Sequence, residues 1–596
     1  MTVHQSVVTD NEISALTLHQ LATIALKVLP QQAESLNQLL SVPQGIDVPF
    51  SKFVLDSRQL MADTDCELPA AFVLLKSHTQ PIEKSQQYAK TASQQAAFIL
   101  TEIPPEDLQY NVQGAERACP LIYIANLRSI IGSLVQLSLL PANSLSTITS
   151  AKDILTLLPH VIAVTGTNGK TTISQLIAQL CQYSNVVDLQ NSAVMGTAGN
   201  GRLDSLVQAS HTTGDVLAVQ SFLHQMADEG VTLLALEASS HGLDQQRLQG
   251  VPVTVAVYTN LSRDHLDYHP DMDDYARAKA RLFDKAFFPQ LTHAIINADD
   301  EFAPLMADTA RRSGVKVWLY SIDAELSTTS DIGNTGHISK INTCDSDASF
   351  IAKKIVPGLN GAVIEVATSF GSLTLHSPLL GRFNVANLLA AVAGATALGI
   401  ELEAMPALVR QLHGASGRMQ RVTMDYVAAN NEAADDQGAA FNQGVFIVDY
   451  AHTPDALTQV LNSLKPYCSG DLWAVFGCGG DRDRGKRPLM AQAGLAVADK
   501  VVLTSDNPRS EDPAVILEDM QQGISDSQRL KTKVIVDRKQ AIEYVVGLAN
   551  QNDIVVIAGK GHETYQEIEG IRYDFDDRLV LQEALIEAQK QVAKHK

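Results

Sequence analysis

The chain has 596 residues, with 45% hydrophobic residues, 19% charged residues and a formal net charge of −21. Such a length is too great for one hydrophobic core, so we expect three domains. The negative charge argues against nucleic acid or an anionic membrane as partner, and an anionic ligand would need a local basic pocket. Six cysteines without a C-x-x-C pair argue against a zinc cluster or disulfide framework and favour a cytoplasmic protein. No signal-peptide pattern and no apolar run long enough to span a bilayer is present.

The first third, residues 1–158, has the pattern of a small α/β module. Apolar residues at helical spacing in the first fifty positions predict surface helices, and short apolar runs at 53–55, 70–75, 96–100 and 121–124 predict four strands. Residues 128–158 have a helical pattern. Ser57 and Arg58, at the end of the first strand, either bind a phosphate or uracil group or form a capped turn with a surface arginine.

The central third, residues 159–413, begins with the stretch that dominates the sequence. An apolar run, Val161 to Val164, enters the turn Thr165-Gly166-Thr167-Asn168-Gly169-Lys170-Thr171-Thr172, and a helix is expected over 173–180. A buried strand, glycines, Lys-Thr and a helix in this order predict a phosphate-binding loop for ATP. Lys170 would reach the outer phosphates and the Thr171 hydroxyl would ligate Mg²⁺. The usual first glycine is replaced by Val164, so the loop is a compact G-x-x-G-K-T-T.

Two further strands of this third end in groups suited to a metal. The strand 232–237 ends in Glu237, and the strand 253–258 leads into a segment, 259–269, with two histidines and two aspartates. In a doubly wound parallel sheet, ligands bind beyond the carboxyl ends of the strands, which favours metal coordination there over a solvated turn.

Other segments of the central third are less specific. The polar loop 208–215, which opens a helix at Val216, either caps that helix or holds a phosphate, and 294–300 is a strand that ends in polar groups. The segment 273–283 is helical, and by residue chemistry alone its Lys279 is an ordinary exposed lysine. Residues 321–349 form a polar surface excursion, and an Ala-rich helix runs from about 382 to 399.

The last third, residues 414–596, has four strands that end in polar, glycine-rich loops, with a hinge at 417–420 and a flexible loop at 429–443. This pattern predicts a Rossmann-like domain with a site at its loop edge. Arg482 and Arg509 are suited to grip a carboxylate, and Glu563 to hold an ammonium, as an amino acid zwitterion requires; each is otherwise a surface ion pair.

Taken together, these motifs resemble the Mur ligases of peptidoglycan synthesis. The resemblance covers about residues 55–578 and includes G-T-N-G-K-T-T, E-A-S-S-H-G-L, N-L-S-R-D-H-L-D-Y-H, G-R-F-N-V-A-N, D-Y-A-H-T-P, G-C-G-G-D-R-D, D-N-P-R and G-K-G-H-E. It implies a three-domain α/β protein with an N-terminal substrate domain, a central P-loop sheet and a C-terminal Rossmann-like domain. The compact P-loop is the form that this family uses.

The resemblance also implies a role for individual residues. ATP would be bound by Gly166, Thr167, Asn168, Gly169, Lys170, Thr171, Thr172, Asn297, Asn384, Arg418, Asp449 and His452. Thr171, Glu237, His265 and a carbamylated Lys279 would organise Mg²⁺, with Lys170, His265 and Lys279 as catalytic groups.

Two substrates are implied, UDP-N-acetylmuramoyl-L-alanyl-D-glutamate and meso-2,6-diaminopimelate, the latter favoured over L-lysine by the intact D-N-P-R signature. The first would contact Leu55, Ser57, His211, Thr212, Thr213, Ser239, Gln245 and Arg247, and the second Arg482, Asp506, Asn507, Pro508, Arg509, Gly559 and Glu563. The chain departs from the family pattern in two places: His211 stands where Asn is usual, and Ser77-His78-Thr79-Gln80-Pro81 replaces a G-H-x-x-D-G-like segment. The first fifty residues and the 429–443 loop are additions to the pattern.

The implied reaction is ATP-driven amide formation through an acyl phosphate, with closure of the C-terminal domain, by a cytoplasmic monomer. One alternative is the L-lysine-adding reaction. The other is a P-loop nucleotide switch that ligates nothing, against which the Arg-rich loops of the last third argue.

Overall fold

The computed structural model of the chain describes residues 16–43, 46–60, 68–77, 80–110, 119–209, 211–266, 268–323, 346–358, 361–423 and 444–594. They form two compact units. The first contains the residues up to 320 with 346–349 and 390–401, and the second contains 321–323, 350–358, 361–389 and the residues from 402 onward. The 429–443 loop, most of the 321–349 excursion, Asp267, and His78 and Thr79 of the Ser77–Pro81 segment lie outside the described residues. The three-domain division stays a prediction.

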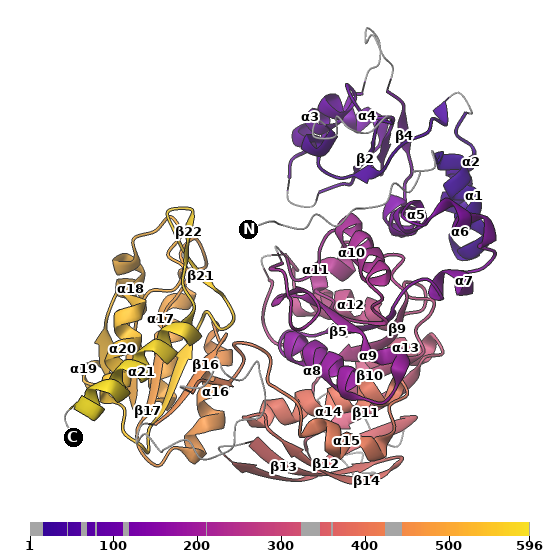
Figure 1. The fold of residues 1–596 in the computed structure, drawn as a ribbon. Helices are drawn as coiled ribbons and strands as arrows, with labels where there is room; N and C mark the ends of the chain where they lie inside the picture. The colour runs from indigo at the N-terminus through magenta and orange to yellow at the C-terminus, as the bar shows by residue number, and fades with distance from the viewer. Residues whose placement is uncertain are drawn as a thin grey trace, which may run out of the picture. The chain divides into compact units, whose positions relative to one another are not determined.

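The N-terminal part of the first unit is a four-stranded parallel sheet in the order β1-β2-β3-β4. Its strands are β1 Phe53–Val54, β2 Ala71–Leu74, β3 Ile99–Thr101 and β4 Leu121–Tyr123, at the four predicted places. The helices α3 (Ile82–Ala92) and α4 (Pro105–Leu108) lie beside this sheet, and η3 (Ser57–Leu60) follows β1 (Figure 1).

The segment before this sheet is helical, as predicted, and is built into the core. It comprises α1 (Leu18–Val28), η1 (Pro30–Gln32) and α2 (Ala33–Leu40), and α1 begins at a capping box formed by Thr17 and Gln20. One face of α1 is fully buried, through Leu18, Leu21, Ala22, Ala25 and Val28, and the helix packs on α5 (Ile131–Ser138). The described part of the N-terminal extension therefore shares a hydrophobic core with the rest of the unit.

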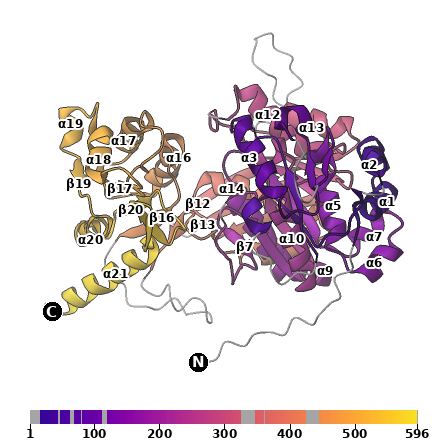
Figure 2. The ribbon, with the colours of Figure 1, turned by 90° about the horizontal axis from the view of Figure 1, so that it is seen from above.

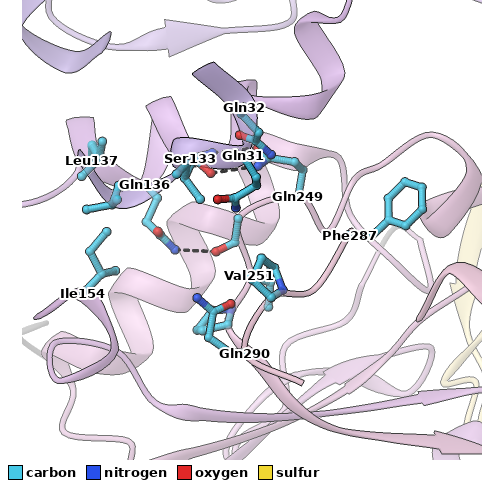
Figure 3. Close-up of a pocket in the computed structure, with 15 residues that line it drawn as sticks. Gln31, Gln32, Ser133, Gln136, Leu137, Ile154, Gln249, Val251, Phe287 and Gln290 are labelled. Carbon is cyan, nitrogen blue, oxygen red and sulfur yellow. Dashed lines mark hydrogen bonds between the residues drawn. The ribbon is translucent and has the colours of Figure 1, made fainter. Parts of the chain in front are cut away.

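Figure 3 shows where this extension and α5 meet the loop at 249–252. A small cavity of about 40 Å³ lies there, and its lining includes several glutamines. The Gln249 amide donates to Ser133 Oγ (2.8 Å) and the Gln136 amide donates to the Gly250 carbonyl (2.9 Å). A Cβ on Gly132 would lie 1.9 Å from the Gln249 carbonyl oxygen, so a glycine is needed for this close approach. The N-terminal part is thus joined to the central sheet by buried amide hydrogen bonds.

The central sheet of the first unit has the strand order β11-β10-β9-β5-β8-β6-β7, and only the β6–β7 pair is antiparallel. The strands are β5 His160–Thr165, β6 Ser192–Gly196, β7 Gly199–Gly201, β8 Leu233–Glu237, β9 Val253–Tyr258, β10 His293–Asn297 and β11 Lys316–Ser321. Five of them, β5 and β8 to β11, alternate with helices, which explains their parallel arrangement.

Helices cover both faces of this sheet (Figure 1). On one face, α10 (Val216–Asp228), α12 (Met272–Ala280) and α13 (Ala303–Arg312) bury apolar residues against β5, β8, β9 and β10. On the other, Ile177 of α8 (Lys170–Tyr183) and Gly394 of α14 (Arg382–Ala397) meet Ile162 of β5. The predicted doubly wound sheet is confirmed. The remaining helices of this unit are η4 Leu127–Ser129, α6 Ala142–Thr147, α7 Ala151–Leu155, α9 Val187–Gln190, α11 Ser240–Asp244 and η5 Arg281–Phe283.

The second unit begins with an antiparallel meander that the sequence analysis did not predict. It consists of β12 (Ala348–Gly358), β13 (Gly361–Thr368) and β14 (Gly371–Ser377), with a register shift between Ala352 and Lys354. The short helices η8 (Leu402–Ala404) and α15 (Met405–Val409) follow.

The C-terminal sheet has the order β15-β16-β20-β17-β18-β19 and is parallel except for β15. Its strands are β15 Gln420–Arg421, β16 Val445–Asp449, β17 Leu472–Phe476, β18 Lys500–Leu503, β19 Thr532–Val534 and β20 Ile554–Ala558, and a hairpin is formed by β21 Tyr565–Ile568 and β22 Ile571–Asp574.

Figure 2 shows this sheet between two helical layers. One layer comprises α16 (Pro454–Leu464), α17 (Lys486–Val497) and α18 (Pro513–Gln521), and the other α20 (Arg538–Leu548) and α21 (Asp577–Lys594). The short η10 (Lys465–Tyr467) and α19 (Asp526–Arg529) complete the unit. The Rossmann-like prediction is confirmed. Within the described ranges, no helix has the length and apolar character that crossing a membrane would require.

We expect Leu21→Ala to lower the thermal unfolding midpoint of the protein clearly, because it removes a fully buried side chain from the α1 core. A cavity of this kind costs about 2–5 kcal/mol. Lys27→Ala, at an exposed position on the same helix, is the control and should leave the midpoint nearly unchanged. Equal midpoints for the two variants would show that α1 is not part of the core.

Candidate functional site

The loop after β5 has the geometry that binds a phosphate. Gly166 and Gly169 have φ values of 151° and 88°, in the region that favours glycine. A Cβ on Gly166 would lie only 1.8 Å from the Thr259 hydroxyl. The helix α8 starts at Lys170, directly after the loop, so its N-terminal N–H groups face the position of an anion. The predicted strand, loop and helix are all confirmed.

The ends of the neighbouring strands hold this loop in shape. The Asn168 N–H donates to Asn260 Oδ1 (3.0 Å), and the Thr259 hydroxyl donates to the Asn168 carbonyl (2.6 Å). The Asn297 amide donates to the Thr259 carbonyl (2.7 Å), so this predicted residue reaches the loop through Thr259. Thr172 is buried in the first turn of α8. These hydrogen bonds hold the loop in one conformation.

Two lysines converge on one carbonyl oxygen of this loop. Lys170 Nζ donates to the Gly166 carbonyl (3.0 Å) and to the Thr167 carbonyl (2.8 Å), and Lys279 Nζ donates to the same Gly166 carbonyl (2.9 Å). Lys279 is 1% exposed, which corrects its interpretation as a surface lysine. Burial, followed by the charge of Lys170, holds the pKa of Lys279 well below its usual value, so the structure favours a neutral amine there.

The Glu237 carboxylate lies beside the loop. Its Oε1 accepts from the Thr171 hydroxyl and the Thr197 N–H (both 2.9 Å), and its Oε2 accepts from the Thr197 hydroxyl (3.1 Å). A Cβ on Gly196 would lie 2.1 Å from Glu237 Oε1, so a glycine is needed beside the carboxylate. The sequence analysis missed Thr197, although the glycine before it, at a strand end, was a signal.

His265 lies beside Tyr275, whose hydroxyl contacts the P-loop. It has a φ of 55°, unusual for a residue with a side chain, and such strain is concentrated at functional sites. The centre of its ring lies 5.0 Å from that of His241 and 5.8 Å from that of Tyr275. Tyr275, also missed by the sequence analysis, lies 3.2 Å from the Thr167 hydroxyl and stacks under Lys279 Nζ at 4.6 Å.

Thr171 and Glu237 provide the oxygen ligands that Mg²⁺ prefers. In the described ranges, no three His, Cys, Asp or Glu side chains come together closely enough to hold a metal by themselves. The sequence predictions add His265 and a modified Lys279, and a metal here would take any remaining ligands from phosphate or water.

A cavity of about 340 Å³ brings together four of the predicted substrate residues, Leu55, His211, Gln245 and Arg247. Lys76 and Arg128 add two positive charges to its wall. This is the local basic pocket that an anionic ligand of an acidic protein requires.

The predicted threonines connect this cavity to Glu237. Arg247 donates to the Thr213 carbonyl (2.9 Å), and the Thr213 hydroxyl donates to the Glu237 carbonyl (2.8 Å). The Thr212 hydroxyl lies 3.1 Å from that of Thr197. Ser239 caps α11 through Gly242, and its N–H donates to Thr213. Ser57, at the start of η3, is not among the residues that line the cavity.

Arg128 was missed by the sequence analysis and joins three segments at the cavity wall. It donates to the Glu102 carboxylate (2.8 Å), the Lys76 carbonyl (2.6 Å) and the Gln245 carbonyl (3.1 Å). Lys76 and Glu102 follow the strands β2 and β3, whereas Gln245 belongs to the central part of the unit. Arg128 therefore connects the N-terminal sheet to the central part.

The other predicted nucleotide residues belong to the second unit. Asp449, at the end of β16, accepts from the N–H groups of Met419 and Ala451 (both 2.7 Å), and burial raises its pKa. Arg418 stacks on the Tyr450 ring at 4.5 Å, and the His452 ring lies 4.7 Å from the same ring. Burial lowers the pKa of His452. Asn384 is buried at the start of α14, where it donates to the Leu380 carbonyl (2.7 Å).

The predicted amino-acid residues gather at the loop edge of the C-terminal sheet. Asn507 donates to the Glu563 carboxylate (2.9 Å), and a Cβ on Gly559 would lie 2.5 Å from Asp506 Oδ2. Arg509 has a φ of 53°, and its side chain donates to the Gly480 carbonyl (2.7 Å). Gly480 packs against the backbone of Pro508. Arg482 is exposed, near Gly479.

Glu511, missed by the sequence analysis, joins the two arginine-containing loops of this edge. Its carboxylate accepts from the Asp481 N–H (2.6 Å), Arg487 (2.7 Å) and Arg484 (3.0 Å). The Ser510 hydroxyl also donates to Asp481, at 2.6 Å. Arg487, followed by the Asp481 N–H, lowers the pKa of Glu511 from 4.5 to about 2.

The doubly wound sheet, the P-loop and the carboxylate beside it define a P-loop enzyme of the α/β class. Sequence comparison makes this specific. The Mur ligase middle domain matches residues 164–395, and the Mur ligase, glutamate ligase domain matches residues 437–561.

A protein from Vibrio vulnificus (strain YJ016), named UDP-N-acetylmuramoyl-L-alanyl-D-glutamate--2,6-diaminopimelate ligase, is 36% identical over 92% of this chain and 96% of its own length. A solved structure of a ligase of that name is 42% identical with a TM-score of 0.59, over 91% of this chain and 96% of the other. Mycobacterium tuberculosis folylpolyglutamate synthase complexed with ADP shares the fold at 18% identity, with a TM-score of 0.51 over 72% of this chain and 92% of that one. The chain belongs to the Mur ligase family, as the motifs predicted.

We expect Glu511→Gln to lower the thermal midpoint at neutral pH and to have less effect in acid. Because the pKa of Glu511 is depressed from 4.5 to about 2, its ionised form stabilises the fold above pH 4.5, and this contribution is lost as the pH falls to about 2. Midpoints measured across this range should therefore converge. Glu518→Gln, at an exposed position on α18, is the control. A difference that stays constant with pH would contradict the assignment.

Proposed function

We propose that the protein is an ATP-dependent ligase that joins meso-2,6-diaminopimelate to the D-glutamate of UDP-N-acetylmuramoyl-L-alanyl-D-glutamate. The observation that carries this proposal is the cluster of Lys170, Thr171, Glu237 and Lys279 at the P-loop, in a chain whose relatives are named for this reaction. It suits phosphoryl transfer, which needs positioning and charge neutralisation more than covalent chemistry.

ATP is proposed to bind with its phosphates on the loop 166–172. The loop N–H groups and the start of α8 would hold the β- and γ-phosphates, with Lys170 released from the Gly166 and Thr167 carbonyls to neutralise them. Asn297 supports the loop through Thr259. In the second unit, Asn384, Arg418, Asp449 and His452 are proposed for the nucleoside side, where the Tyr450 ring already stacks on Arg418.

Mg²⁺ would be held by Thr171, Glu237, His265 and a carbamylated Lys279, and it would neutralise the charge that develops on the transferred phosphoryl group. The environment of Lys279 supports the carbamate. Only a neutral amine adds to CO₂, and burial next to Lys170 disfavours the charged form of Lys279. The product loses a proton and becomes an anion, which the neighbouring Lys170 ammonium would stabilise.

The cavity lined by Leu55, His211, Gln245 and Arg247 is proposed to take the UDP-muramoyl dipeptide, with Lys76 and Arg128 facing its negative charge. Thr212, Thr213 and Ser239 lie between this cavity and Glu237, where the dipeptide end of the substrate must come close to the phosphoryl group. Ser57, two residues after Leu55, completes the proposed set.

In the proposed reaction, an oxygen of the D-glutamyl γ-carboxylate attacks the γ-phosphorus of ATP, and ADP leaves. The amine of diaminopimelate then attacks the acyl phosphate carbonyl, loses a proton and displaces phosphate. An acyl phosphate is quickly lost to water, so its site must exclude solvent during the second step. We propose that the C-terminal domain closes over the reaction centre to exclude this water.

The proposed diaminopimelate pocket consists of Arg482, Asp506 to Arg509, Gly559 and Glu563. Arg509 would bind a carboxylate, and Glu563 an ammonium group. Arg509 is partly held by the Gly480 carbonyl, and its strained backbone directs it into this loop edge. We further propose that the protein is a cytoplasmic monomer of three domains, 1–158, 159–413 and 414–596.

Phosphate release tests the function directly. With ATP, Mg²⁺ and the UDP-muramoyl dipeptide, we expect release that depends on meso-diaminopimelate and not on L-lysine. Release with L-lysine alone would make the protein the lysine-adding ligase. Nucleotide binding without any amino-acid-dependent release would make it a nucleotide switch.

We expect Lys279→Ala to lose most of the ligase activity, because the carbamate that organises the metal is absent. Addition of a short-chain carboxylic acid should restore part of the activity by supplying the missing carboxylate. Lys285→Ala, at a partly exposed lysine beyond the same helix, is the control. Activity of Lys279→Ala at the level of the wild type, without any acid added, would refute the carbamate.

We expect Arg509→Ala to raise the KM for meso-diaminopimelate by well over tenfold and to leave the KM for ATP nearly unchanged. Loss of one partner of a buried charged pair costs about 2–5 kcal/mol. Arg484→Ala removes an exposed arginine of the neighbouring loop and serves as the control. If the two variants have the same KM for the amino acid, Arg509 does not bind its carboxylate.

A further inference from the structure

The G-K-G-H-E loop contains a buried lysine that the proposed reaction has not used. Lys560 follows β20, and its side chain is 0% exposed. Its Nζ donates to Asn507 Oδ1 and to Glu563 Oε2, both at 3.1 Å, and lies 5.5 Å from the centre of the Tyr565 ring. A buried ammonium is costly unless it is paired, and all three of these neighbours attract a cation.

We propose that Lys560 is a positioning residue of the amino-acid site, which holds Asn507 and Glu563 in the orientation and charge that bind the substrate ammonium. This inference rests on the proposed function, because it concerns the diaminopimelate pocket.

The orientation of the Asn507 amide depends on Lys560. Asn507 Oδ1 accepts from Lys560 Nζ and from the Glu567 N–H (3.0 Å), while its Nδ2 donates to Glu563 Oε2 (2.9 Å). An amide oxygen only accepts, so the two donors at Oδ1 turn the amide nitrogen toward Glu563. Asn507 and Lys560 both donate to Glu563 Oε2. Glu563 Oε1 then accepts from the ammonium group of the amino acid.

The charge of Glu563 also depends on Lys560. Burial raises the pKa of Glu563, and the nearby Asp506 raises it further, whereas the Lys560 ammonium is the largest influence that lowers it. Lys560 therefore keeps the carboxylate ionised in a partly buried place, where its side chain is 17% exposed. The titratable and charged groups that interact electrostatically with Glu563 include Lys560, Asp506, Tyr450, Tyr565 and Arg538.

Removal of the Lys560 charge has a defined pH signature. The pKa of Glu563 would rise further, so the protonated fraction of Glu563 would be larger in the variant than in the wild type and would grow as the pH falls. A protonated carboxyl does not pair with an ammonium, so the KM for the amino acid would rise with falling pH more steeply in the variant than in the wild type. A lysine with only a structural role would not change the pH dependence of KM.

The test measures kcat, the KM for meso-diaminopimelate and the KM for ATP between pH 6.5 and 9 for wild type, Lys560→Met and Lys560→Gln. We expect both variants to raise the amino-acid KM at least tenfold at pH 6.5, with a smaller effect at pH 9 and little change in the KM for ATP. Lys539→Met, at an exposed lysine of α20, is the matched control. Thermal unfolding midpoints show whether each variant is folded. If Lys560→Met does not fold, the comparison is made with Lys560→Gln.

Glu563→Gln alone and together with Lys560→Met completes a double-mutant cycle. If Lys560 acts through Glu563, the double variant should be no worse than Glu563→Gln, and its KM should not depend on pH. Additive effects, or a pH profile of Lys560→Met parallel to the wild type, would overturn the proposal. A wild-type protein without diaminopimelate-dependent activity would overturn the proposed function. An active wild type combined with additive effects or parallel pH profiles would overturn the inference about Lys560 alone.

Discussion

The Gly166 carbonyl accepts hydrogen bonds from two lysine amines, and the chemistry of the first unit depends on how Lys170 and Lys279 share it. Two full positive charges on one buried oxygen repel each other, and Lys279 is the one that is fully enclosed. The environment therefore favours a neutral Lys279, which is the form that can be carbamylated. Lys170, the first residue of α8, would exchange the Gly166 and Thr167 carbonyls for a phosphate. Burial and the neighbouring charge of Lys170 thus lower the pKa of Lys279, which lies 113 positions away in the sequence from the Gly166 carbonyl that it contacts.

The same principle of buried charge organises the second unit. Lys560 is enclosed among an amide oxygen, a carboxylate and an aromatic ring, and Arg538 is enclosed with Asp577 at 2.7 Å. Arg538 also donates to the carbonyl of Ala558, which ends β20, and to the carbonyl of Ser505, two residues after β18. Each cation fixes the loop that follows a strand, so the loop edge can present Asp506, Asn507 and Glu563 together. The same cations thus stabilise the loops and the proposed amino-acid site.

Much of the fold could be predicted, because apolar runs, glycine turns and helical periodicity are local signals. The strands around Val161, Leu233 and Ile554 lie where the sequence placed them. The antiparallel meander at 348–377 was missed, since only pairing between its strands identifies it. At the site, Lys279 was recognised by family resemblance alone, because its burial depends on packing from distant segments. Tyr275 and Arg128 were missed because their roles follow from hydrogen bonds across 108 and 117 positions, and no local motif marks them. Thr197, which contacts Glu237 across 40 positions, was marked only by the glycine before it.

The central claim is that a carboxylate of the UDP-muramoyl dipeptide is activated as an acyl phosphate before an amine displaces phosphate. Transfer of ¹⁸O tests it most directly. The γ-carboxylate of the D-glutamyl residue is labelled with ¹⁸O, the reaction is run with ATP and meso-diaminopimelate, and the phosphate is analysed by mass spectrometry. The account predicts one ¹⁸O atom in each phosphate released from fully labelled substrate. Unlabelled phosphate formed together with the amide product would contradict it.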